Sequence, residues 1–174
     1  MNNEISKEFH QSAMRNGTIL GAVWSAMYLL LFMGTTNTAA LMLVAALYFS
    51  SPFIAAKLAI KYRRTECNDI MPYTHAWLYV AYMYLCATLL STLVIYIYFT
   101  FIDGGTFFMS LQSILDETAG MTGTDEQFLQ QIEQTKNILE QITIGSFVWQ
   151  NMSNNLFSTS VMSLVIALFV KRKG

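Results

Sequence analysis

Four long apolar runs are the feature that most limits how this chain can fold. They cover residues 17–33, 38–60, 76–102 and 147–170. Each falls in the range of roughly 17–25 residues that an α-helix needs to cross the hydrocarbon core of a bilayer, or slightly exceeds it. Charged residues make up only 12% of the chain, against about 25% in ordinary soluble proteins, and they gather outside the runs. The sequence therefore predicts an all-α integral membrane protein, a four-transmembrane-helix bundle forming one membrane domain over residues 1–174.

A basic stretch after the second run predicts how the helices are oriented. It contains Lys57, Lys61, Arg63 and Arg64. Lysine and arginine stay on the cytoplasmic side of a membrane, so this loop and both termini are predicted to be cytoplasmic. Nine of the ten cations then lie inside, with Lys136 outside, and seven of the eleven acidic residues lie outside. We therefore expect a multi-pass membrane protein with both termini in the cytoplasm and the basic stretch at the lipid headgroups.

Residues 103–146 differ from the rest because they are more polar and seven of their eight charged residues are acidic. Residues 106–118 can form one short helix. Farther on, Phe128, Ile132 and Leu139 recur at spacings of three to four residues or their sum, which is typical of an amphipathic helix. The sequence predicts an extracytoplasmic helical hairpin between the third and fourth spans.

Small residues recur along one face of the first run. Gly17, Gly21 and Ser25 are spaced by four residues, which lets another helix approach the backbone closely. Two interpretations are open. The face can pack against another span of the same chain, or it can hold a second copy or a different membrane protein.

Polar side chains gather in the first half of the fourth run. Lipid cannot hydrogen-bond their amide groups, so they must meet protein or water. Either they are bonded inside a dry bundle, or they line a polar groove that faces Tyr82 or Tyr84 of the third run. The residues of this polar patch are Asn151, Asn154, Asn155 and Ser158.

Pro52 interrupts the second run directly after Ser50 and Ser51. Proline removes one backbone hydrogen bond, which predicts a kink, and the two serine hydroxyls can bond the freed carbonyl groups. The kink is either structural or a hinge.

The sequence lacks the motifs of common catalytic sites. It has no phosphate-binding glycine loop, no dinucleotide fingerprint and no zinc-protease motif. Cys67, Cys86 and the two histidines lack the spacing of metal ligands. A net charge of −1 argues against a nucleic-acid partner. We therefore expect no catalytic residues, no metal and no cofactor.

Several of these features together resemble a known family. A small-residue first span, a kinked second span ending in Lys61-Tyr62-Arg63-Arg64, a third span ending near residues 101–103, an acidic outer insert and a basic tail are similar to the bacterial membrane proteins of domain-of-unknown-function family 4199. The resemblance implies a small inner-membrane protein. It also implies an association with membrane-bound glycosyltransferase systems, and it supplies no catalytic residues.

Three functions are compatible with the sequence. The first is a non-catalytic accessory or scaffolding subunit of a membrane complex, whose partners are membrane lipids and another membrane protein or a second copy of the chain. The alternative is a small transporter or lipid-handling protein that works as an oligomer. A further alternative is a membrane sensor or regulator with the outer hairpin as its receiver.

Overall fold

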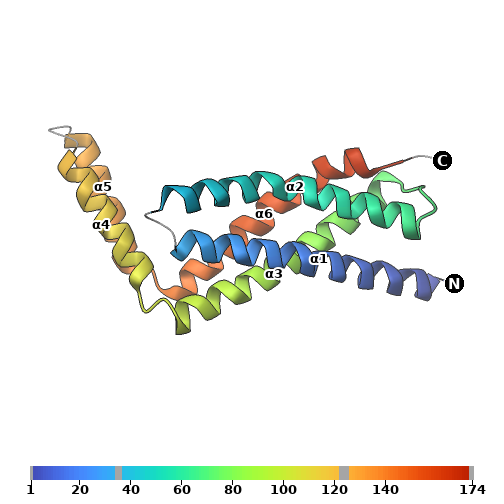
Figure 1. Ribbon diagram of the computed structural model, residues 1–174, viewed down its shortest axis with the longest axis horizontal. Helices are drawn as coiled ribbons and strands as arrows, with labels where there is room; N and C mark the ends of the chain where they lie inside the picture. Colours follow the sequence, from blue (N-terminus) through green and yellow to red (C-terminus); the bar gives the residue numbers. More distant parts are fainter. Residues whose placement is uncertain (1, 34–36, 122–125, 173–174) are drawn as a thin grey trace.

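The computed structural model describes residues 2–33, 37–121 and 126–172, and this part of the chain contains six α-helices. Four of them are long and apolar enough to cross a membrane: α1 (Asn2–Met33), α2 (Thr38–Glu66), α3 (Tyr73–Phe101) and α6 (Ile144–Val170). They run along the long axis of the molecule and pack against one another (Figure 1). The prediction of an all-α fold with four helices that could span a membrane is confirmed for the described residues.

The long helices extend beyond the predicted spans. Lengths of 27–32 residues correspond to roughly 40–48 Å, more than the roughly 30 Å of a hydrocarbon core. Helix α1 begins at Asn2, well before the first apolar run, because its polar part packs on α3. Asn16 donates to the Tyr79 hydroxyl at 2.7 Å, and Ser12 shares a hydrogen bond with the same hydroxyl at 3.1 Å. The first helix is therefore part of the bundle over most of its length.

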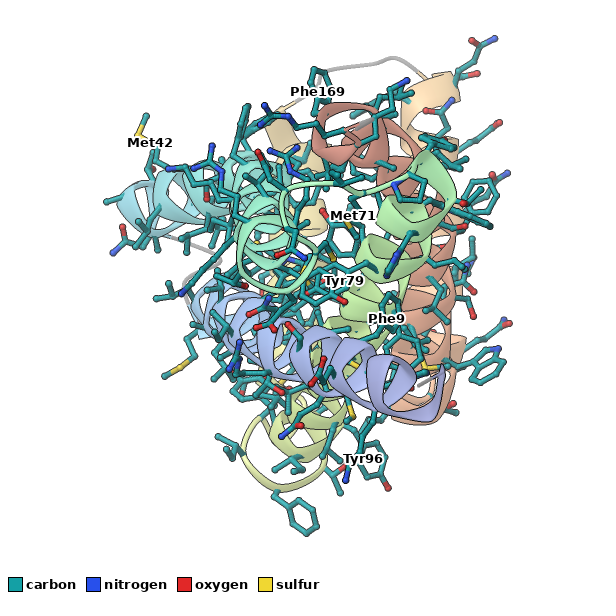
Figure 2. All side chains as sticks on the ribbon, turned by 90° about the vertical axis from the view of Figure 1, so that its right-hand side faces the viewer. Phe9, Met42, Met71, Tyr79, Tyr96 and Phe169 are labelled. Carbon is teal, nitrogen blue, oxygen red and sulfur yellow. The ribbon has the colours of Figure 1, made fainter. Side chains whose placement is uncertain are left out.

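The core lies between the four long helices, and α2 contributes Ala55, Ala59 and Tyr62 to it. Figure 2 shows the bundle from one end, with Met71 and Tyr79 between the helices, and Met42, Tyr96 and Phe169 pointing outward. Met71 and Tyr79 are fully buried, whereas the three outward side chains are exposed. Large apolar side chains on the outside are expected where the solvent is lipid.

Two shorter helices, α4 (Thr106–Met121) and α5 (Glu126–Gln141), lie side by side at one end of the bundle and at an angle to it (Figure 1). We call this end the insert end. The Lys136 ammonium group contacts the Asp116 carboxylate between the two helices. At the start of α4, the buried Asp103 carboxylate accepts hydrogen bonds from the backbone N–H groups of Gly105 and Phe107, each at 3.1 Å. This capping fixes the point where the chain turns out of the bundle.

An aromatic cluster joins the insert end to the bundle. The Phe32 and Phe99 rings have centroids 4.8 Å apart, and those of Phe99 and Phe147 are 5.2 Å apart. Phe107 of α4 packs into the same cluster. Helix α4 is thus anchored to α1, α3 and α6 by ring packing.

The opposite end holds both chain ends and the α2–α3 loop, and we call it the basic end (Figure 1). Met71 and Arg172 form an antiparallel bridge, with two N–H to oxygen distances of 2.9 Å. The Arg63 guanidinium donates to the Asp69 carboxylate at 2.9 Å and to the Val170 carbonyl at 2.6 Å. Arg172 also contacts Asp69. These contacts tie the C-terminal end of α6 to the α2–α3 loop.

The four cations of the basic stretch do not share one environment. Lys57, Lys61 and Arg64 are exposed at the basic end, as expected for headgroup contacts, but Arg63 is only 7% exposed. Its planar fork is bound by a carboxylate and a carbonyl of the same chain, which lysine could not match. Arg63 thus makes its contacts within the chain, and the headgroup contacts predicted for the basic stretch stay a prediction.

Candidate functional site

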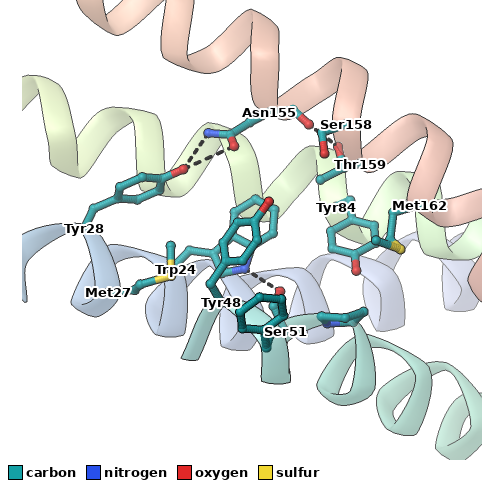
Figure 3. A pocket seen from close by; sticks show the side chains of 12 residues that line it. Trp24, Met27, Tyr28, Tyr48, Ser51, Tyr84, Asn155, Ser158, Thr159 and Met162 are labelled. Carbon is teal, nitrogen blue, oxygen red and sulfur yellow. Dashed lines mark hydrogen bonds between the residues drawn. The ribbon is translucent and has the colours of Figure 1, made fainter. Parts of the chain in front are cut away.

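A cavity of about 180 Å³ lies where α1, α2, α3 and α6 meet, near the middle of the long helices (Figure 3). Trp24 and Met27 of α1 and Tyr84 of α3 form its buried walls. The exposed side chains of Tyr48 and Phe49 on α2 form part of its rim. Because these exposed residues lie partway along α2, the cavity opens on the side of the bundle.

Aromatic side chains dominate the cavity walls. The Trp24 and Tyr84 rings are stacked, with centroids 5.7 Å apart and an interplanar angle of 29°. The Trp24 indole N–H donates to the Ser51 hydroxyl at 2.7 Å. This hydrogen bond holds α1 to α2 at the depth of the cavity. Because the indole needs a buried acceptor, it also fixes the orientation of the wall.

One part of the predicted polar patch reaches the cavity. The Asn155 amide donates to the Tyr28 hydroxyl at 2.8 Å (Figure 3). It also donates to the Asn151 side-chain oxygen at 2.8 Å. Tyr28 also lines the cavity, and Ser158 lies exposed at its rim. Asn154 is exposed and does not line the cavity. The structure thus brings Asn151, Asn155 and Ser158 together and leaves Asn154 outside.

The predicted groove between the third and fourth spans has a different character. A shallow groove of about 350 Å³ does lie between α3 and α6, and Tyr82, Thr159 and Ser160 are among the residues that line it. None of the four residues of the polar patch lines this groove. Asn155 instead meets Tyr28 of α1 and shares the central cavity with Tyr84. Tyr84 is one of the two neighbours that the sequence predicted, whereas the contact with Tyr28 was not predicted because the sequence could not show which face of α6 meets α1.

The small-residue face of α1 packs inside the chain. A Cβ atom on Gly17 would lie 2.6 Å from the Met83 carbonyl oxygen, and one on Gly21 would lie 3.1 Å from the Ala87 backbone. Ser25 is buried and donates to the Gly21 carbonyl at 2.7 Å. Of the two interpretations left open by the sequence, packing against another span of the same chain is confirmed. This face is not available to a second copy.

Helix α2 continues through Pro52, which lines the cavity. Ser50 donates to the Leu47 carbonyl at 2.9 Å, one residue away from the Tyr48 carbonyl that proline leaves without its usual partner. Ser51 accepts from Trp24 instead. The serines therefore do not take the roles predicted from the sequence, and whether Pro52 acts as a hinge stays a prediction.

A comparison with known protein families assigns the chain to one of them. A family model described as "Protein of unknown function (DUF4199)" matches residues 15–172. The chain belongs to the DUF4199 family. The match covers most of α1 and all the other helices, and so includes every residue of the cavity. No curated protein and no solved structure matches this chain.

The hydrogen-bonding side chains that line the cavity of this DUF4199 protein carry hydroxyl, amide and indole groups, and Met27 and Met162 add thioethers. Among the described residues, no carboxylate, imidazole or thiol lines it. Within residues 2–33, 37–121 and 126–172, no three metal-ligating side chains gather in one place. The cavity can therefore hold an apolar molecule and offer it a few hydrogen bonds.

The sequence analysis did not identify Trp24 and Tyr28 as residues of a candidate site. Both lie in the middle of the first apolar run, whereas tryptophan and tyrosine are typical of the membrane interfaces. A tryptophan deep in a span needs a buried acceptor for its N–H, which could have predicted its contact with Ser51. This is the signal that would have directed attention to the cavity.

Proposed function

We propose that this DUF4199 protein is a non-catalytic protein of the cytoplasmic membrane that binds a lipid-soluble molecule between its helices. The observation that carries the proposal is the lateral opening of the central cavity. A lipid-soluble molecule can enter it from the bilayer without crossing a headgroup region. Its aromatic walls suit an apolar ligand, and the small set of polar groups can orient it, as in ligand sites generally.

The same proposal places both termini and the basic end in the cytoplasm, and α4 with α5 outside as a helical hairpin. Both ends of the chain and the α2–α3 loop lie at one end of the bundle, so they share one side of any membrane that the four helices cross. The positive-inside rule assigns that side to the cytoplasm, because the basic stretch lies there.

Native mass spectrometry of the full chain, extracted from its own membrane in mild detergent, tests the binding function. We expect one bound lipid-soluble molecule per chain. Ser158→Trp should displace it by filling the rim, whereas Val161→Trp should keep it, because Val161 is exposed on the same helix but does not line the cavity. Retention in Ser158→Trp, or its absence from the unmodified protein, would contradict the proposal.

A second candidate function is that of an accessory subunit, and the insert end favours it. Met109 of α4 and Ile138 of α5 are 63% and 62% exposed, and both lie on the helices that project from the bundle. Exposed apolar side chains outside the lipid are typical of contacts with another protein. Blue-native electrophoresis tests this: Ile138→Lys should release a co-migrating partner and Asn137→Lys should not.

A further inference from the structure

The cavity contains more polar groups than a hydrocarbon chain could use. Tyr84 lies eleven residues into α3 and Asn155 eleven residues into α6, so both are about 17 Å from the nearer helix end. At this depth a phospholipid presents only methylene groups. The cavity nevertheless presents the hydroxyls of Tyr28, Ser51 and Ser158 besides that of Tyr84.

The Tyr84 hydroxyl is the most informative of these groups. Its side chain is 2% exposed and lines the cavity, and no hydrogen bond joins its hydroxyl to another residue in the part of the chain that the structure describes. Buried tyrosine hydroxyls normally have a partner. The nearby Ser51 hydroxyl accepts from Trp24 and keeps its own proton to donate. Tyr84 and Ser51 are thus two donors available to a ligand.

The shape of the cavity favours a ring over a chain. Its buried wall is the stacked pair of Trp24 and Tyr84, and the Tyr48 and Phe49 rings lie at the rim. Flat aromatic walls pack best against another flat ring. The volume of about 180 Å³ is close to the roughly 150 Å³ of an engineered apolar cavity that binds benzene.

We propose that the cavity binds the ring of a lipid-soluble quinone, whose isoprenoid tail leaves past Tyr48 and Phe49 into the bilayer. The ring lies against Trp24 and Tyr84, and its carbonyl oxygens accept hydrogen bonds from the Tyr84 and Ser51 hydroxyls. The hydrocarbon part of an acyl chain has no acceptor and leaves both donors without partners. The proposal concerns binding of the quinone alone, without electron transfer, and it rests on the binding function proposed above.

Quenching of tryptophan fluorescence measures this binding directly. The full chain carrying Trp77→Phe and Trp149→Phe keeps Trp24 as its one tryptophan, in the wall of the cavity. Titration with a ubiquinone that has one isoprene unit should quench Trp24 saturably. Tyr84→Phe should weaken binding about tenfold, the effect of one lost hydrogen bond. Tyr96→Phe, on the lipid-facing side of the same helix, should leave the affinity unchanged.

Oleic acid provides the second arm of the experiment. Equal quenching in Tyr84→Phe and Tyr96→Phe, or quenching that never saturates, overturns the quinone assignment. If bound lipid is displaced by oleic acid and not by the quinone, the quinone assignment fails while the binding function stands. If neither compound binds, both fail. If Tyr84→Phe does not fold, Ser51→Ala replaces it as the test variant. We expect Ser51→Ala to lose quinone affinity severalfold. An unchanged affinity would count against the proposal.

Discussion

At the scale of single residues, the contact between α1 and α3 depends on the missing side chain of Gly17. The nearest atoms to a Cβ there are the Met83 backbone oxygen and the Cys86 Cβ atom, at 2.6 and 2.7 Å. Neither belongs to the far end of a flexible side chain. Any larger residue must therefore push the two helices apart.

Gly17→Ala should lower the free energy of unfolding by about 1–3 kcal/mol, the usual effect of overpacking a close contact. Gly120→Ala is the matched control, because a Cβ on Gly120 in α4 meets nothing within 4 Å. It should be neutral or slightly stabilising, since alanine favours a helix. Thermal unfolding in detergent measures both. A Gly17→Ala protein as stable as the control would contradict the described helix contact.

The hydrogen bond between Tyr28 and Asn155 is a second residue-scale feature, because it joins α1 to α6 across the cavity. Tyr28→Phe removes the hydroxyl and should lower stability by about 1 kcal/mol, within the range measured for polar contacts between membrane helices. Tyr96→Phe again serves as the control. An equal effect of the two substitutions in the same unfolding assay would show that the bond does not hold the helices together.

At the scale of elements, α2 has two unlike halves. Its first half, up to Phe49, is mostly exposed, whereas Ala55, Ala59 and Tyr62 pack into the core. The change occurs at Ser51 and Pro52, next to the cavity. The half that borders the opening is therefore the less firmly packed half of the helix.

The basic end of α2 is held by Arg63. Arg63→Met should lower the free energy of unfolding by about 1–3 kcal/mol, less than for a fully buried ion pair, because the Asp69 side chain is 37% exposed. Residues 167–172 should then exchange their amide hydrogens faster. Arg64→Met removes the same charge from an exposed position and is the control. Unchanged exchange in Arg63→Met would show that the C-terminal end is held by other contacts.

The spans could be predicted because the length and polarity of an apolar run are local properties of the sequence. The positions of Asn16 and Arg63 could not be predicted in this way. Asn16 donates a hydrogen bond to Tyr79, 63 positions away, and Arg63 donates one to Val170, 107 positions away. The sequence around either residue therefore does not indicate the contact. The same limit applies to Asn155, whose partner Tyr28 lies 127 positions away.

At the scale of the whole molecule, the arrangement of the ends leads to a prediction about sidedness. A fluorescent protein fused after Gly174 should fold and fluoresce, and alkaline phosphatase at the same point should be inactive, because both report a cytoplasmic end. Phosphatase inserted at Gly120, in α4, should be active. A fluorescent fusion at Gly120 together with an active phosphatase at the C-terminal end would reverse the orientation proposed for the bundle.

The bridge between Met71 and Arg172 also determines the order in which the molecule can assemble. These two residues are about 100 positions apart, and translation at roughly 5–20 residues per second separates their synthesis by about 5–20 seconds. During that interval the first three helices have been synthesised, but Arg63 and Met71 lack their partners on the C-terminal side of the chain. Closure of this end is therefore a late event in biogenesis, and nascent chains halted before α6 should be preferred substrates for membrane proteases.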